Sequence, residues 1–307
     1  MAFTAADVKA LREKTGVGMM ECKKALTEAD GDMDRAIDVL RERGLAASEK
    51  KASRIAAEGV VTVYSEGATS VALEVNAESD FVAKNDVFNQ FVLDVAKTIA
   101  ANSPADVDAL LADKLIGTDR TVQENLQDKV LQIGENIKIR RFEIVKGHTA
   151  SYIHGGGSVA VIVTFDTTDE IAATDEFKAM GKDVAMQVAA MSPAYLDKDA
   201  VPANVIDHEK EILLAQMNED PKMASKPEMV KEKIISGKIS KYYDENCLVC
   251  QDFVKDGDLT VGKYIEKVAK DLGSEIKATG YIRYAKGEGL EKKSENFADE
   301  VAGMMNK

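Results

Sequence analysis

Residues 63–108 read VYSEGATSVALEVNAESDFVAKNDVFNQFVLDVAKTIAANSPADVD, and residues 151–197 read SYIHGGGSVAVIVTFDTTDEIAATDEFKAMGKDVAMQVAAMSPAYLD. The two stretches are diverged copies of one pattern. Their matching anchors are Tyr64 and Tyr152, Ser70 and Ser158, Phe88 and Phe177, Val95 and Val184, and Ser103 and Ser192. Each copy reads as a strand, a glycine-containing turn, a strand, a loop and an amphipathic helix. The repeat therefore predicts an α+β core of two related subdomains, each with a small antiparallel sheet backed by a helix.

The first 54 residues predict a small N-terminal module of three short helices, of the UBA-like kind. Thr4-x-x-Asp7 is a capping-box pattern, and Asp32 is expected to cap the third helix. The stretch TGVGMM interrupts the helical pattern at Gly16 and Gly18 and is expected to form an exposed turn. The polar stretch SEKKASRIAAEG, residues 48–59, is interpreted as a linker.

The segments outside the repeat also carry clear patterns. NIKIRRFEIV (136–145) predicts a strand that follows a helix opened by Thr121-x-x-Glu124. Each Ser-Pro pair is expected to start a short helix, with serine as N-cap. Residues 203–246 predict an antiparallel helical hairpin with narrow apolar stripes, one on Ile206, Leu213 and Met217 and the other on Val230 and Ile234. The C-terminal part predicts a helix at 260–273, a strand and turn at 276–289, and a final helix at 294–305.

These patterns give a division of the chain into six parts. In order, they are an N-terminal helical module with its linker (1–54), the first core subdomain (55–140), the first part of the second core subdomain (141–202), the inserted hairpin (203–246), the completion of the second subdomain (247–285), and a C-terminal module (286–307).

Composition excludes several functional classes. The chain has 307 residues, 45% hydrophobic and 30% charged, which is typical of a globular protein with more than one domain. Its net charge of −13 makes direct nucleic-acid binding unexpected. No apolar run is long enough to span a membrane, and the N-terminus has the pattern of neither a secretory signal nor a transit peptide. We therefore expect a soluble, cytoplasmic protein.

Candidate catalytic chemistry is sparse. Cys247 and Cys250 form a Cys-x-x-Cys pair, but other metal ligands are scattered, and the strand-to-helix setting of a thioredoxin-like motif is missing. We interpret the pair as small side chains packed beside tyrosines. HGGGS (154–158) and KGEGLEK (286–292) are interpreted as glycine turns, and no phosphate-binding loop or dinucleotide fingerprint is present. No cofactor and no metal site are expected.

Phe81 raises a more specific question, because it stands among small and charged residues between a strand and a helix. The second copy of the repeat offers Ile171 at best in this region. A phenylalanine that the fold required should have an equivalent in the sister unit. On the residues alone, burial under the loop and insertion into a partner remain equally plausible.

Three motifs then carry a resemblance. They are LREKTGVGMMECKKALTEADGDMDRAIDVLRERG (11–44), ESDFVAKND (78–86) and TGYIRYAKGEGLEK (279–292). The chain resembles the bacterial translation elongation factor Ts family over essentially its whole length. The family's loop usually reads Thr-Asp-Phe-Val. Here Ser79 replaces the threonine and keeps the hydroxyl, and Cys250 departs from the usual pattern.

The resemblance implies a non-catalytic guanine-nucleotide exchange factor that binds the GDP form of elongation factor Tu in the elongation stage of protein synthesis. Asp80 and Phe81 would enter the partner near its magnesium and phosphate site. The expected partner-binding residues are Val17, Gly18, Met19, Ser79, Asp80, Phe81 and Val82. A homodimer or a 2:2 complex is possible. Two alternatives stay open: a binding protein without exchange activity, and a thiol enzyme that uses Cys247 and Cys250.

Overall fold

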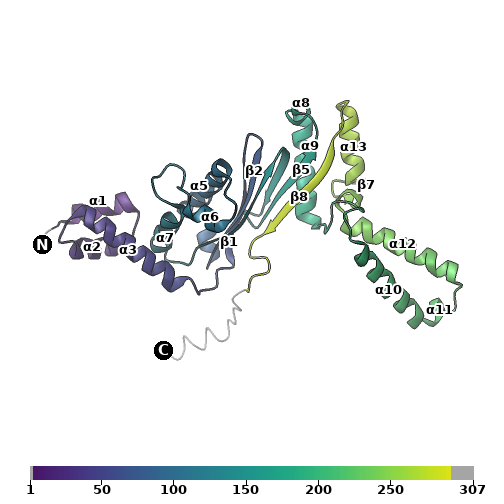
Figure 1. The fold of residues 1–307 in the computed structure, drawn as a ribbon, viewed down its shortest axis with the longest axis horizontal. Coiled ribbons are helices and arrows are strands. Elements are labelled where there is room, and N and C mark those ends of the chain that lie inside the picture. Colours follow the sequence, from purple (N-terminus) through teal and green to yellow (C-terminus); the bar gives the residue numbers. More distant parts are fainter. Residues whose placement is uncertain (1–2, 292–307) are drawn as a thin grey trace. The chain divides into compact units, whose positions relative to one another are not determined.

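The structure is a computed structural model, which describes residues 3–291 (Figure 1). It confirms the predicted α+β class, with N-terminal helices and small antiparallel sheets. Two compact units can be distinguished. Within the described residues, the first contains 3–144, Ile153–Val159 and 284–291, and the second contains Val145–Tyr152 and Ala160–Arg283. The final helix predicted at 294–305 lies outside the described residues.

Three N-terminal helices form the predicted bundle: α1 (Ala5–Thr15), α2 (Met19–Glu28) and α3 (Met33–Lys51). The capping box of α1 is present, since the Thr4 N–H donates to the Asp7 carboxylate at 2.7 Å. Asp32 caps α3 by accepting from the Arg35 N–H at 2.9 Å. The bundle closes on a small core that is made largely of Leu11, Leu26, Leu40 and alanines.

The expected linker after this bundle is wrong over its first part, because α3 continues to Lys51. The extension packs along α7 (Val122–Ile133), whose predicted capping box at Thr121 and Glu124 is confirmed. Gly44 allows a close approach, since a Cβ there would lie 3.3 Å from the Gln127 carbonyl oxygen. Tertiary packing thus stabilises a polar helical segment that sequence alone marks as a connection.

The first repeat contains β1 (Glu58–Glu66) and β2 (Thr69–Ala77), paired antiparallel from Glu58 opposite Ala77 to Glu66 opposite Thr69. β3 (Lys138–Lys146) completes the sheet in the order β1-β2-β3. A short helical turn, α4 (Asp80–Ala83), precedes α5 (Asp86–Asn102), which packs on β1 and β2. The core between helix and sheet includes Leu73, Phe88 and Phe91.

The second repeat follows the same order of elements. Its sheet has the order β4-β5-β8, from β4 (His148–His154), β5 (Val159–Asp166) and β8 (Lys277–Ala285). α8 (Asp169–Ala172) and α9 (Asp175–Met191) correspond to α4 and α5. Gly181 lets α9 lie close to the sheet, since a Cβ there would be 2.5 Å from the Ala150 Cβ. The glycines of HGGGS form the turn between β4 and β5, as predicted.

The two Ser-Pro pairs end helices instead of starting them, which corrects the prediction. Ser103 and Ser192 adopt left-handed conformations with φ of 50° and 47°. Their N–H groups donate to the carbonyls of Ile99 and Val188 and close α5 and α9. The proline that follows each serine prevents continuation of the helix. In the first repeat the next helix, α6 (Val107–Ala112), is capped by Asp106.

The predicted helical hairpin is present as α10 (Ala203–Glu219), α11 (Pro221–Ala224) and α12 (Glu228–Asn246) (Figure 1). Its seam on α12 differs from the prediction, because Ile235 and Ile239 are buried while Val230 is exposed. The cluster around them continues to Cys247 at the base of the hairpin. The remaining elements of the second unit are η1 (Leu248–Cys250), β6 (Asp252–Phe253), β7 (Asp256–Thr260) and α13 (Val261–Asp271).

A buried carboxylate joins β2, β3 and the turn after β8. Glu74 is fully buried, and it accepts hydrogen bonds from Arg140 at 3.0 Å, Arg141 at 2.7 Å, Asn76 at 3.1 Å and the Gly287 N–H at 2.8 Å. Burial by itself would raise the pKa of Glu74, but the hydrogen bonds from Gly287, Arg141, Asn76 and Arg140 together hold the pKa below its ordinary value.

Gly287 is required at this contact for two reasons. Its φ is +67°, and a Cβ would lie 2.3 Å from the Ala57 carbonyl oxygen. The KGEG turn therefore has a larger structural part than the sequence alone suggests.

Glu74→Gln should destabilise the protein by about 3 kcal/mol, because it removes the buried anion shared by Arg140 and Arg141 and leaves Arg141 only its exposed pair with Glu288. We take the low end of the range because both arginines are partly exposed. Urea unfolding at pH 7 measures the change, with the exposed Glu66→Gln as control. Because the pKa of Glu74 is lower in the folded state, its ionised carboxylate stabilises the fold fully above the pKa of the unfolded state. This stability is lost as the pH falls through the folded-state pKa. The difference in stability between wild type and Glu74→Gln should therefore shrink in acid. Equal stability of both variants at pH 7 would contradict the assignment.

Candidate interaction site on the first repeat

Phe81 lies on α4 with its side chain 80% exposed, whereas the neighbouring Val82 is 5% exposed. Successive residues of a helix point about 100° apart. Val82 packs into the core of the first repeat, and Phe81 is consequently turned away from it. The question raised by the sequence is answered for the free protein, since the aromatic ring is not part of the core.

Two backbone hydrogen bonds close the C-terminal side of the turn that carries Phe81. The Lys84 N–H donates to the Phe81 carbonyl at 3.2 Å, and the Asn85 N–H donates to the Val82 carbonyl at 2.9 Å. Asn85 also caps α5 by accepting from the Val87 N–H at 2.8 Å. The exposed phenylalanine therefore sits on an ordered turn.

Ser79, the residue before this turn, is bound by a carboxylate that is distant in sequence. Its N–H donates to one oxygen of Glu135 at 2.9 Å, and its hydroxyl donates to the other at 2.6 Å. A second carboxylate, that of Glu78, accepts from the Asn136 N–H at 2.6 Å and from Arg54 at 3.3 Å. Sequence reasoning missed Glu135, because nothing local links it to a segment 56 residues earlier.

The matching turn of the second repeat shows what the fold itself requires. α4 and α8 are both four-residue helices, and their positions align as Asp80 with Asp169 and Phe81 with Glu170. Val82 aligns with Ile171, so the second repeat has no aromatic side chain at the position of Phe81. Glu170 is exposed. The same turn thus forms with a charged residue at the position of Phe81, and folding does not require the ring.

Asp80 presents its carboxylate beside Phe81. It forms an ion pair with Lys84 at 3.2 Å, in which both side chains are more than half exposed. Exposed pairs of this kind contribute little stability and exchange partners readily. The side chain is therefore accessible to another molecule.

The N-terminal residues assigned to the partner surface divide between core and exposed positions. Val17 is 4% exposed and packs with Cys22 inside the three-helix core, so its expected exposure is wrong. The turn between α1 and α2 is short, and the Val17 side chain fills the space between them. Gly18 is exposed with open space around it, and Met19 and Met20 are exposed too.

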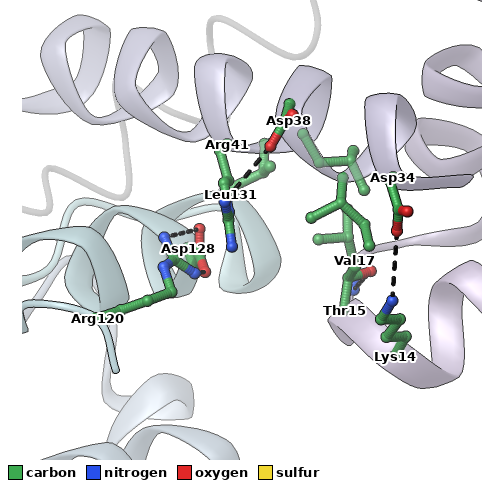
Figure 2. A pocket seen from close by; sticks show the side chains of 11 residues that line it. Lys14, Thr15, Val17, Asp34, Asp38, Arg41, Arg120, Asp128 and Leu131 are labelled. Atoms are coloured by element: carbon green, nitrogen blue, oxygen red, sulfur yellow. Dashed lines mark hydrogen bonds and ion pairs between the residues drawn. The ribbon is translucent and has the colours of Figure 1, made fainter. Parts of the chain in front are cut away.

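A hollow of about 470 Å³ lies where the bundle meets α7. Figure 2 shows that its charged side chains pair with one another. Lys14 contacts Asp34 at 3.9 Å, Arg41 contacts Asp38 at 3.4 Å, and Arg120 binds Asp128. Because the hollow lies where α3 packs against α7, we interpret it as part of that contact.

The cysteine pair is packed at the base of the hairpin and is poorly suited to thiol chemistry. Cys247 is buried, and burial, with the neighbouring Cys250 and Asp197, raises the pKa of its thiol to about 11. Burial also raises the pKa of Cys250. Both shifts disfavour the reactive thiolate.

Residues 3–291 contain no cluster of three or more histidine, cysteine or acidic side chains that could hold a metal ion. Across the same described range, every helix is too short or too polar to cross a membrane.

The geometry thus describes a protein that presents an aromatic side chain on an anchored turn. A family model, "Elongation factor TS", matches residues 78–288. Curated relatives named Elongation factor Ts include one from Syntrophotalea carbinolica, 48% identical with 99% of both chains covered, and one from Clostridium kluyveri, 48% identical with 97% of both covered. Another, from Clostridium novyi, is 47% identical with 99% of both covered. The chain belongs to the elongation factor Ts family of translation factors.

Because Val82 is buried and Phe81 is exposed, we expect unequal losses of stability when each is truncated. Val82→Ala should destabilise the protein by about 2 kcal/mol, because it removes buried methyl groups and leaves a cavity. Phe81→Ala should change the free energy of unfolding by no more than ~0.5 kcal/mol. Urea denaturation compares the two directly. A larger loss from Phe81→Ala than from Val82→Ala would show that the ring is part of the core.

Proposed function

We propose that this protein is a guanine-nucleotide exchange factor for elongation factor Tu, and that it acts by inserting the turn with Asp80 and Phe81 near the magnesium and phosphate site of that GTPase. The observation that carries the proposal is an exposed phenylalanine on an anchored turn, at a position where the sister turn has glutamate. Family membership supports the choice of partner.

The mechanism needs no chemical step by this chain. An exchange factor binds the nucleotide-free partner more tightly than the nucleotide-bound one. By linkage, nucleotide then weakens the binding of the factor as much as the factor weakens the binding of nucleotide. Phe81 would act as a wedge between partner helices, and the Asp80 carboxylate would perturb the groups that hold the magnesium ion. The factor itself is then non-catalytic.

The remaining contacts are proposed from the same family relation. The N-terminal bundle, through Gly18 and Met19, and the first repeat would meet the nucleotide-binding domain of elongation factor Tu. The second repeat would meet another domain. Ser79 and Val82 would contribute by supporting the turn, because Ser79 is bound to Glu135 and Val82 is buried. A 2:2 assembly is compatible with this proposal and is tested by the mass of the complex in solution.

Phe81→Ala should slow the release of labelled GDP from elongation factor Tu by about one to two orders of magnitude at limiting factor. Burial of the ring in the partner would contribute roughly 1.5–3 kcal/mol, and each ~1.4 kcal/mol corresponds to tenfold. Met229→Ala is a control that removes another exposed apolar group, on the hairpin. Release at the wild-type rate by the Phe81 variant would exclude the wedge. Complex formation by the wild type without faster release would indicate a binding protein only.

Replacing both Met19 and Met20 by serine should weaken the complex and raise the concentration of factor that gives half-maximal exchange, by about threefold to tenfold. The rate at saturating factor should change little, because these residues supply affinity and do not touch the nucleotide site. Met229→Ser, which changes an exposed methionine of the hairpin, is the matched control. An unaltered half-maximal concentration for the double variant would remove the N-terminal bundle from the interface.

A further inference from the structure

We propose that Glu135 is a positioning residue that sets the direction in which Phe81 is presented. This inference rests on the proposed function, since it concerns the same turn. It adds a residue that lies outside the turn and is far from it in sequence.

The contact between Glu135 and Ser79 has the geometry of a clamp. Both carboxylate oxygens are used, one by the Ser79 N–H at 2.9 Å and the other by its hydroxyl at 2.6 Å. Two bonds from one residue to one carboxylate fix the orientation as well as the position of the backbone where α4 begins. Both residues are half-buried, so water competes only partly for these bonds.

An anchor from outside is needed because α4 has little stability of its own. A helix of four residues has a single turn, and nucleation of one turn is unfavourable in isolation. The Ser79 hydroxyl would ordinarily cap such a turn, yet here it makes no capping bond and is directed to Glu135. The orientation of α4 is therefore set by Glu135 and by the burial of Val82.

The backbone around Glu135 is arranged to reach the turn. Gly134 follows the last residue of α7, and its φ of +87° lets the chain turn sharply toward residues 78 and 79. Asn136, the residue after Glu135, donates from its N–H to Glu78 at 2.6 Å and from its side chain to the Arg54 carbonyl at 2.9 Å. Each segment thus supplies one carboxylate to a backbone N–H of the other, which holds the two together.

The second repeat builds its matching turn differently. Thr168 stands where the first repeat has Ser79, and its hydroxyl accepts from the Ile171 N–H at 3.4 Å as an ordinary N-cap. The carboxylate clamp thus accompanies the copy whose turn displays an aromatic side chain. This association is expected if the clamp serves presentation, because the fold alone forms the same turn with a local cap.

The test begins with the isolated protein, where chymotrypsin cleavage after Phe81 reports how often the turn opens. Glu135→Ala should accelerate cleavage at this bond, mapped by mass spectrometry, by at least about fivefold. The urea midpoint should stay close to that of wild type. Glu135→Gln should restore protection, because an amide can accept from the Ser79 N–H and donate to its hydroxyl. Asp119→Ala is the control for loss of an exposed carboxylate.

The second measurement is GDP release from elongation factor Tu. Glu135→Ala should lower stimulated release by about fivefold to tenfold through lost preorganisation. In a Phe81→Ala background, the same change should have a much smaller effect, because the clamp acts mainly through the ring and only Asp80 of the same turn remains to be misplaced. Additive losses in this double-mutant cycle would overturn the positioning role.

The two measurements separate failure of this inference from failure of the proposed function. Unchanged cleavage at Phe81 in Glu135→Ala would overturn the clamp whatever the exchange results. If Glu135→Ala is cleaved faster but Phe81→Ala exchanges nucleotide at the wild-type rate, the clamp is supported and the role of Phe81 as a wedge is rejected. If Glu135→Ala fails to fold, Ser79→Ala removes only the hydroxyl bond. That variant must still open the turn, and protection equal to wild type would count against the inference.

Discussion

The burial of Val82 is the constraint on which the proposed site depends. Within a single helical turn, one side chain can enter the core only if its neighbour points elsewhere, and Val82 enters the core between sheet and helix in the first repeat. Phe81 is exposed as a result. The aromatic ring is therefore in contact with water in the free protein, whereas the sister turn carries a charged glutamate at the same position. We infer that the exposed ring is kept for contact with a partner.

Acidic side chains have a structural role in the first compact unit. Glu74, Glu78 and Glu135 each accept hydrogen bonds from a backbone N–H of a segment far away in sequence. Such charge-assisted bonds are stronger than neutral ones, and they join strands, helix ends and turns that a small apolar core cannot hold alone. These three carboxylates thus contribute to the fold itself.

Much of the fold could be predicted from the sequence, because its signals are local or periodic. The repeat, the capping boxes at Thr4 and Thr121 and the hairpin all follow from spacing that a single segment displays. The errors arose where distant packing decides. α7 stabilises the polar end of α3, and the short turn between α1 and α2 draws Val17 inside. The two serines before proline differ from the prediction because Ser-Pro is typical of a helix start, whereas here each serine takes the left-handed position at a helix end that usually belongs to glycine.

The candidate site was predictable only in part. Phe81 can be recognised from its sequence neighbours, which are small or charged. Its alignment with Glu170 and the hydrogen bonds from Ser79 to Glu135 depend on the folded structure. No pattern near Ser79 indicates that its hydroxyl is bound by a residue beyond α7.

In the proposed mechanism, Phe81 leaves water when the protein binds nucleotide-free elongation factor Tu. Fluorine NMR of a fluorophenylalanine placed at position 81 reports this step. The resonance should shift on complex formation and return to its free position when GDP is added, since nucleotide and factor weaken each other's binding. A complex that forms while the resonance stays at its free position would exclude insertion of the ring.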